Sequence, residues 1–334
     1  FPYTTLFRSF LFPGQGAKRV DVALRSTVRP AAGRALCELA AAEAGVALAK
    51  VLERPSLLDR TEVLQPMLTA IALAASEALA AAGVLPTVVL GHSLGELAAW
   101  SASGAVPAAE AVRLAAVRGR LMARAAAAKP GGMVALGTAD AGVIEEALAV
   151  GRCSGEICVA AYNAPDETVL SGDEAAVRAA MAFAPALATR VPTAGAWHSP
   201  AMLGAVDEWR SALHAAKLGD VLGVDFVANA HGDVVSCSAD IPDLLAEQLV
   251  RPVQWARALA TATRPVMVTL GPGAVLRSLW HRNQGMPRAG ESAAGGAGSP
   301  HAGVLTTSRP KSSPFATDDE RALAETIAAL RAVQ

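Results

Sequence analysis

The sequence predicts an α/β protein in which a large domain with a parallel sheet carries a smaller inserted subdomain. Three observations support this prediction. The chain has 334 residues, of which 52% are hydrophobic and only 18% charged, so it can form a large core. Residues 88–99 have the pattern of a strand, a sharp turn and a helix. Residues 131–192 follow the order strand, helix, strand, strand, helix, strand.

The charges and cysteines exclude several classes of protein. Lys and Arg (29) nearly cancel Asp and Glu (30), so no overall field attracts nucleic acid or an acidic membrane. The four cysteines have neither the spacing of a metal knuckle nor the density of a disulfide framework: Cys37, Cys153, Cys158 and Cys237. This usage indicates reduced thiols, and we expect a cytoplasmic protein without metal or cofactor.

No membrane span or leader is predicted. The most apolar region, residues 70–90, is interrupted by polar and turn-forming residues, namely Ser76, Glu77, Gly83 and Pro86. Residues 1–9 lack a basic segment followed by a long apolar one, so they do not resemble a signal peptide and need not be native sequence.

The strand-turn-helix at residues 88–99 contains a Gly-x-Ser-x-Gly motif centred on Ser93. Gly91 and Gly95 have no Cβ, so strand and helix can approach closely at a corner that exposes the Ser93 hydroxyl. The helix begins at the serine, and its free N–H groups face any oxyanion that forms there. The alternative is a packing turn, but the flanking strand and helix favour a nucleophile.

A second turn follows the first predicted strand. Residues 10–12 lead into Pro13-Gly14-Gln15-Gly16, whose backbone amides could bind an anion. An ordinary strand-to-helix turn explains the same residues, and the sequence alone leaves both readings open.

Helices are predicted at 30–43, at 66–82 with Pro66 in its first turn, and from Pro107 to about Ala128. In the third, Arg113, Arg120 and Arg124 share one face, whereas Arg118 lies on the apolar face. A buried guanidinium needs an anion. Arg118 therefore has either a buried carboxylate partner or a role in binding a carboxylate ligand.

The pattern of residues 131–193 predicts a ferredoxin-like βαββαβ subdomain, with a turn at Asn163-Ala164-Pro165-Asp166. His198 follows the point where the chain leaves the subdomain and returns to the large domain, so its side chain could face a cleft between them. His92 should point away from Ser93, because neighbouring strand residues face opposite sides. The remaining histidines are expected at the surface: His214, His231, His281 and His301.

The expected division is a large α/β-hydrolase-like domain of residues 10–130 and 194–284, the subdomain at 131–193, a Gly- and Ser-rich linker at 285–316, and a closing helix in 317–334. Within the large domain, strands are expected at 224–229 and 265–270, a helix at 241–249, and a second helix that follows a turn at Gly271-Pro272-Gly273 and runs through Arg282. Thr317 to Glu320 has the pattern of a capping box for the closing helix.

The chain resembles the malonyl-CoA:acyl carrier protein transacylases and the acyltransferase domains of polyketide synthases. The resemblance covers Phe10 to about Arg282 and rests on seven segments in the family's order: residues 12–16, 91–96, 118–122, 163–165, 196–200, 248–255 and 271–273. It implies transfer of a malonyl group from CoA to the phosphopantetheine thiol of an acyl carrier protein, by a protein expected to be monomeric.

The resemblance also implies roles for individual residues. Ser93 would be the acylated nucleophile and His198 its general base, oriented by the backbone carbonyl of Gln248. The amides of Gln15 and Leu94 would form the oxyanion hole. Arg118 would bind the malonyl carboxylate, with Trp197, Asn163 and Met122 also lining the substrate site. Malonyl-specific relatives often have Phe before the active histidine, whereas methylmalonyl-specific ones have Ser. The bulkier Trp197 at this position should crowd an α-methyl group.

Three alternatives fit less well. A serine thioesterase or hydrolase would use water in place of the carrier thiol, and Arg118 argues against a generic esterase. A silent carrier-binding module is disfavoured by Ser93, His198 and Arg118 together. The acyltransferase subunit of malonate decarboxylase is disfavoured because its relatives usually lack the His and Glu found here at positions 92 and 96.

Arg190, on the strand before the expected cleft, is a candidate contact for the acidic carrier.

Overall fold

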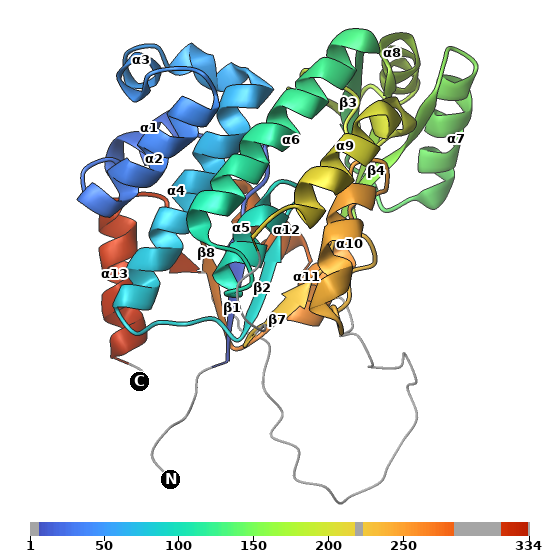
Figure 1. The fold of residues 1–334 in the computed structure, drawn as a ribbon. Helices are drawn as coiled ribbons and strands as arrows, with labels where there is room; N and C mark the ends of the chain where they lie inside the picture. The colour runs from blue at the N-terminus through green and yellow to red at the C-terminus, as the bar shows by residue number, and fades with distance from the viewer. Residues whose placement is uncertain (1–6, 218–222, 284–314, 333–334) are drawn as a thin grey trace, which may run out of the picture.

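The computed structural model describes residues 7–217, 223–283 and 315–332. Its larger sheet is parallel, with the strand order β7-β2-β1-β8-β9 (Figure 1). The strands are Arg8–Phe12 (β1), Val88–Gly91 (β2), Asp225–Val227 (β7), Val266–Thr269 (β8) and Phe315–Ala316 (β9). The predicted parallel α/β architecture is confirmed.

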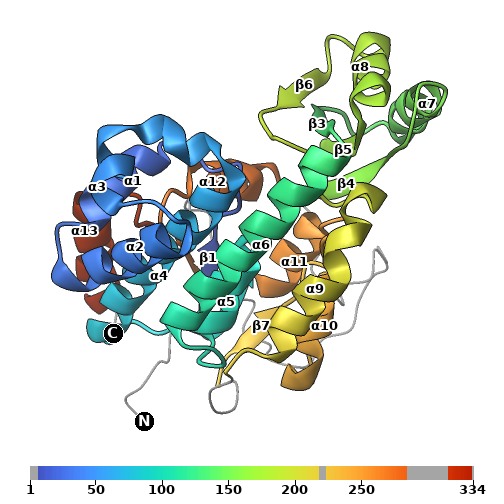
Figure 2. The same ribbon diagram turned by 45° about the horizontal axis from the view of Figure 1, so that its top comes forward.

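Helices cover both faces of this sheet, as expected for parallel strands. The helix α6 runs diagonally across the molecule from the larger sheet toward the smaller one (Figure 2). The helices of this part are Val20–Thr27 (α1), Ala31–Glu43 (α2), Leu48–Glu53 (α3), Thr61–Ala81 (α4), Gly95–Ala102 (α5), Ala108–Ala128 (α6), Leu203–His214 (α9), Ile241–Glu247 (α10), Trp255–Ala262 (α11), Ala274–Arg282 (α12) and Glu320–Arg331 (α13).

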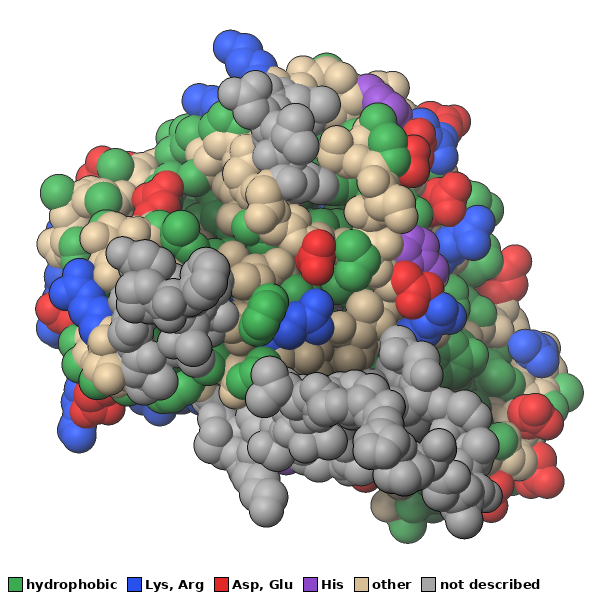
Figure 3. Space-filling view, turned by 90° about the horizontal axis from the view of Figure 1, so that it is seen from below, with side chains coloured by type: hydrophobic (Ala, Val, Ile, Leu, Met, Phe, Trp, Pro, Cys, Tyr) green, Lys and Arg blue, Asp and Glu red, His purple; other side chains and the backbone are tan. Residues whose placement is uncertain are grey.

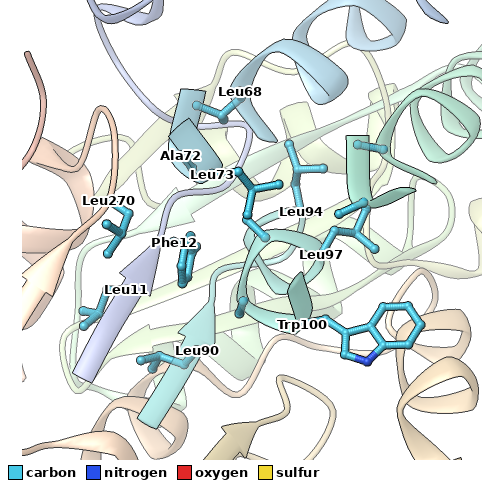
Figure 4. Packing of buried hydrophobic residues seen from close by; sticks show 14 of the residues in the cluster. Leu11, Phe12, Leu68, Ala72, Leu73, Leu90, Leu94, Leu97, Trp100 and Leu270 are labelled. Atoms are coloured by element: carbon cyan, nitrogen blue, oxygen red, sulfur yellow. The ribbon is translucent and has the colours of Figure 1, made fainter. Parts of the chain in front are cut away.

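The main core forms where α4 and α5 pack on the central strands. Every residue of β1 and β2 is buried, which fits their continuous apolar sequences. Figure 4 shows the side chains of these strands and helices in one cluster: Leu11, Phe12, Leu68, Ala72, Leu73, Leu90, Leu94, Leu97, Trp100 and Leu270. This packing holds the start of α5 firmly against the ends of β1 and β2.

The helix α4 differs from its prediction. It begins at Thr61 rather than at Pro66, because the carbonyl of Arg60 accepts hydrogen bonds from the amides of Val63 and Leu64 and starts the helix one turn earlier. Pro66 then lies inside the helix, where it removes a single N–H donor. The helix is long and apolar enough to cross a membrane, but 78% of its most apolar window is buried inside the protein. It is therefore a core helix.

The smaller sheet is antiparallel, with the order β4-β5-β3-β6. Its strands are Gly131–Leu136 (β3), Ile157–Ala164 (β4), Glu167–Asp173 (β5) and Ala188–Val191 (β6), and its helices are Ala141–Arg152 (α7) and Glu174–Phe183 (α8). This arrangement is the predicted ferredoxin-like unit. It has a second core cluster of its own, which includes Val134, Leu170 and Val177.

The C-terminal segment required two corrections. Residues 285–314 of the predicted linker lie outside the described residues, but Phe315 and Ala316 pair with β8 as a strand. Thr317 does not cap α13, because its hydroxyl accepts from the amide of Gly271 (2.8 Å) and donates to the carbonyl of Thr269 (2.9 Å). Asp319 caps the helix by accepting from the amide of Ala322 (2.9 Å).

The surface agrees with the balanced composition. On the face seen in Figure 3, acidic and basic side chains are interspersed among apolar and neutral ones. Many of the charged groups form ion pairs, such as Arg277 with Asp318 (2.6 Å) and Arg257 with Asp233 (2.5 Å). The described residues visible on this face form no extended surface of one sign.

Candidate active site

Ser93 lies at a strained turn between β2 and α5. Its φ is 52°, in the left-handed region that non-glycine residues rarely adopt. A Cβ on Gly91 would lie 1.9 Å from the carbonyl carbon of Gly95, and one on Gly95 would lie 2.2 Å from the carbonyl oxygen of Phe12. Only glycine fits at either position, as the motif predicted. The turn therefore presents the Ser93 side chain clear of the backbone.

The Ser93 hydroxyl is hydrogen-bonded to His198. Ser93 Oγ lies 2.7 Å from His198 Nε2, and His198 Nδ1 lies 2.7 Å from the backbone carbonyl of Gln248. A carbonyl can only accept, so Nδ1 carries the proton and Nε2 is free to accept one from the hydroxyl. Burial, followed by the charge of Arg118, lowers the pKa of His198 to about 3. The imidazole is therefore unprotonated and uncharged at neutral pH, so Nε2 can accept a proton.

Asn229, which the sequence analysis missed, anchors the serine turn. Its Oδ1 accepts from the amide of Ser93 (2.7 Å) and its Nδ2 donates to the carbonyl of Gly91 (2.7 Å). The residue is fully buried and follows β7, the strand next to β2. The position of Asn229 after a buried strand was the available signal, but only the sheet order brings it to Ser93.

Arg118 points from α6 to the serine, as its place on the apolar face suggested. The side chain is 2% exposed, and Nη2 donates to Ser93 Oγ (3.2 Å) and to Gln248 Oε1 (2.8 Å). Nη1 donates to Gln65 Oε1 (3.2 Å). Burial lowers the pKa of Arg118 to about 10, so it stays a cation at neutral pH. Among the described residues no carboxylate forms a direct ion pair with it.

The nearest acidic group reaches Arg118 through an amide. Glu96 is 2% exposed, and its carboxylate accepts from the amide of Asn229 (2.6 Å) and from the side-chain amide of Gln248. Burial raises the pKa of Glu96 to about 8, against the opposing effects of these two hydrogen bonds and of Arg118. The sequence left open whether Arg118 has a buried carboxylate partner. Glu96 is buried nearby, but it is linked to the guanidinium through the side chain of Gln248 rather than by a direct ion pair.

Gln65, a second residue that the sequence analysis missed, connects Arg118 to Gln15 and Met122, which were both predicted as site residues. Its Nε2 lies 3.3 Å from both Gln15 Oε1 and Met122 Sδ, while Gln15 Nε2 donates to the hydroxyl of Thr61 (2.8 Å). Gln65 thus contacts the guanidinium directly, and Gln15 and Met122 contact Gln65. A glutamine inside an apolar helix was the only signal in the sequence.

The turns that carry Gln15 and Leu94 lie against each other. A Cβ on Gly14 would lie 2.5 Å from the carbonyl oxygen of His92, so the loop after β1 contacts the serine turn closely. The amides of Gln15 and Leu94 donate to no other group in residues 7–217, 223–283 and 315–332. Both are available to an oxyanion.

His92 and Asn163 hold each other. His92 Nε2 lies 2.8 Å from Asn163 Oδ1, and its ring packs on Trp255 with centroids 5.1 Å apart. Asn163 Nδ2 donates to Glu167 Oε1 (2.9 Å). The expected direction of His92, away from the serine hydroxyl, agrees with this pairing. Both polar ends of the Asn163 side chain are already engaged within the protein.

Neither Trp197 nor Arg190 has a hydrogen bond to Ser93, His198 or Arg118 among the described residues. Trp197 is 4% exposed, its ring lies over Gly195 beside Ala126, and its Nε1 has no partner in the part of the chain that the structure describes. Arg190 donates to both carboxylate oxygens of Glu174 (3.1 and 2.5 Å). Its charge is paired inside the subdomain, which weakens it as a carrier contact.

The other groups considered in the sequence are four histidines and four cysteines. His214 bonds to Asp243 (3.3 Å) and is half exposed, His231 is partly exposed, His281 is exposed, and His301 lies outside the described residues. The four cysteines are free thiols. Within the described ranges, no group of three or more His, Cys, Asp or Glu side chains could hold a metal ion.

Comparison with known proteins shows two kinds of relative. The chain is 36% identical over 208 residues to a malonyl CoA-acyl carrier protein transacylase of Mycolicibacterium smegmatis, covering 61% of this chain and 69% of the relative. It is 32% identical over 286 residues to a polyketide synthase of Streptomyces halstedii, covering 81% of this chain but 4% of the relative.

The fold and the family agree as well. A solved malonyl-CoA:acyl carrier protein transacylase of Xanthomonas oryzae superposes with a TM-score of 0.76 at 31% identity, over 84% of this chain and 93% of that one. The model of the acyl transferase domain family matches residues 9–282, which include Ser93, Arg118, His198 and Gln248. The chain therefore belongs to the acyl transferase domain family, as the sequence resemblance indicated, and is an acyltransferase related to the transacylases and to the polyketide synthase domains.

Proposed function

We propose that this acyltransferase moves a malonyl group from CoA to the phosphopantetheine thiol of an acyl carrier protein. The observation that carries the proposal is the buried Arg118 guanidinium 3.2 Å from the hydroxyl of the Ser93–His198 pair. A cation this close to the nucleophile favours an acyl group with its own carboxylate. Two of its five N–H groups donate to no described residue, and the contact with Ser93 can be exchanged.

In the first half-reaction, His198 Nε2 takes the Ser93 proton as the oxygen attacks the thioester carbonyl. The amides of Gln15 and Leu94 would stabilise the oxyanion, and the carbonyl of Gln248 would stabilise the imidazolium through Nδ1–H. Collapse breaks the carbon–sulfur bond, and His198 returns the proton to the CoA thiolate. Ser93 is left as a malonyl ester.

The second half-reaction reverses these steps with a different thiol. His198 removes the proton of the carrier's phosphopantetheine thiol, whose sulfur attacks the ester, and the proton then returns to Ser93 Oγ. The same oxyanion hole serves both halves. Arg118 would hold the carboxylate throughout, so the acyl group stays in place while the thiols exchange.

The relatives support the substrates. The Mycolicibacterium and Xanthomonas proteins are named for malonyl-CoA and acyl carrier protein. Charge also favours malonate: bound acetyl would leave the buried guanidinium without a carboxylate partner, so acetyl transfer should be slow. We further propose that the protein acts in the cytoplasm and that Trp197 disfavours an α-methyl group.

The test is to incubate the protein with malonyl-CoA and a purified phosphopantetheinylated carrier and to follow the carrier by intact mass. We expect malonyl-carrier to form in the wild type and not in Ser93→Ala. Hydrolysis of malonyl-CoA without loading of the carrier would instead identify a thioesterase. Failure of Ser93 to acquire any acyl group would contradict catalysis by this site.

A further inference from the structure

Glu96 has an unusual environment for a carboxylate. It lies in the first turn of α5, three residues after Ser93, and is 2% exposed. Its two oxygens have different donors: Oε1 accepts from the amide of Asn229 (2.6 Å), and Oε2 accepts from Nε2 of Gln248. A glutamine side chain could not replace it without loss, because it has one acceptor oxygen and its NH2 group would face a donor.

Gln248 connects Glu96 to the reacting groups. Its Nε2 also donates to the carbonyl of Ser93 (2.9 Å), and its Oε1 accepts from Arg118 Nη2 (2.8 Å). Its backbone carbonyl accepts from His198 Nδ1 (2.7 Å). One residue therefore bonds to the base, the nucleophile's backbone and the guanidinium, and Glu96 is the acid that bonds to its side chain.

The direction of the Gln248 amide follows from its neighbours. The carbonyl of Ser93 can only accept and Arg118 can only donate, so the NH2 end faces Ser93 and the oxygen faces Arg118. The same NH2 group also donates to Oε2 of Glu96. A flipped amide would place two acceptors together at one end and two donors at the other, which is costly in a buried site.

We propose that Glu96 is a positioning residue that acts through the Gln248 side chain to hold Arg118 in the orientation needed for a carboxylated acyl group. The proposal rests on the function proposed above. Glu96 would not touch the acyl group or the thioester, because it reaches Arg118 only through Gln248. Its loss should chiefly impair reactions that depend on Arg118, because the Gln248 backbone carbonyl can still orient His198.

The experiment compares malonyl-CoA with acetyl-CoA in acylation of Ser93, using Glu96→Gln, Gln248→Leu and the double variant. We expect Glu96→Gln to lower the malonyl-to-acetyl ratio of kcat/KM about tenfold, through loss of the hydrogen bond between Glu96 and the Gln248 side chain. Gln248→Leu should lower it similarly, and the double variant should lose little more, because both changes break one link. Glu96→Asp should recover part of the ratio.

Controls separate this result from general damage. Glu110→Gln changes a first-turn glutamate of α6 that pairs with Arg113 (3.2 Å) on the protein surface, and it should leave the ratio unchanged. If Glu96→Gln does not fold, Glu96→Asp decides the question, because it keeps the acid but shortens its reach to Gln248 and should lower the ratio, whereas Gln248→Leu also removes the direct bond to Arg118. An unchanged ratio in the folded variants, or additive losses in the double variant, would overturn the proposal.

The outcome remains distinct from that of the proposed function. If the wild type does not take malonyl from CoA, the proposed function fails. The link is then tested by the rate at which Ser93 reacts with a fluorophosphonate bearing a carboxylate and with its methyl ester. Glu96→Gln should slow the first reaction about tenfold more than the second, and equal slowing would refute the role of Glu96.

Discussion

Replacement of Arg118 with methionine should remove the preference for malonate. Methionine fills a similar apolar volume without the cation. In the wild type, a substrate carboxylate would meet one unpartnered N–H group of Arg118 together with the neighbouring Nη2–H that now donates to Ser93 (3.2 Å). A buried hydrogen bond to a charged group contributes about 1.5–3 kcal/mol, so two would contribute about 3–6 kcal/mol.

This free energy sets the expected change in rate. Even the lower value predicts a fall of roughly 150-fold in kcat/KM for malonyl-CoA. Acetyl-CoA has no carboxylate to lose, so its kcat/KM should change far less. The ratio of the two corrects for damage to Gln65 and Gln248, which each lose a donor in the variant.

The assay is stopped-flow or quench-flow acylation of Ser93 with each thioester. Arg120→Met is the matched control, since Arg120 lies on the exposed face of the same helix and, among the described residues, donates only to the carbonyl of Glu43 (2.9 Å). Equal losses for malonyl-CoA and acetyl-CoA in Arg118→Met would refute the role of Arg118 in binding the carboxylate.

Three further predictions concern the turn and the pocket. Asn229→Ala leaves the amide of Ser93 and the carbonyl of Gly91 without their partner, so thermal unfolding should show a loss of about 2–4 kcal/mol together with slower acylation; an unchanged melting temperature would contradict this. Gly95→Ala forces a Cβ to 2.2 Å from a backbone oxygen and should abolish folded, active protein, whereas Gly204→Ala, with no atom within 4 Å, should be tolerated in the same expression and activity tests. Trp197→Ser should raise transfer of methylmalonyl relative to malonyl in a competition assay, and no gain would count against a role in acyl size.

The sequence was most informative where local chemistry decides the structure. The motif around Ser93 predicted the turn because two glycines without a Cβ are required by contacts of 1.9 and 2.2 Å. The position of Arg118 on an apolar helix face predicted a buried cation, and its 2% exposure bears this out. In each case the signal lies within a short stretch of sequence, although the atoms that enclose it include distant ones such as the carbonyl of Phe12.

Features that depend on distant segments were not predictable. Asn229 reaches the serine turn from 136 residues away, and Gln65 reaches Arg118 from 53 residues away, through the order of the strands and the packing of α4 on α6. The hydroxyl of Thr317 bonds to residues 46 and 48 positions earlier rather than capping its own helix. Tertiary partners override the local pattern at these positions.

The start of α4 shows the same limit in a helix. Pro66 has the sequence signature of a first turn, yet the chain extends the helix back to Thr61. Thr61 is buried and its hydroxyl accepts from Gln15 Nε2 (2.8 Å), a contact between segments 46 residues apart. The local rule places proline correctly near the N-terminal part of a helix, but packing fixes where that helix begins.

The central claim is that a buried guanidinium selects a carboxylated acyl group for Ser93. The most direct measurement is a competition in which the wild-type protein meets equal concentrations of malonyl-CoA and acetyl-CoA, is quenched before turnover, and is digested for peptide mass spectrometry. We expect the peptide containing Ser93 to carry malonyl almost exclusively. Equal amounts of acetyl and malonyl on Ser93, or acyl groups on another residue, would contradict it.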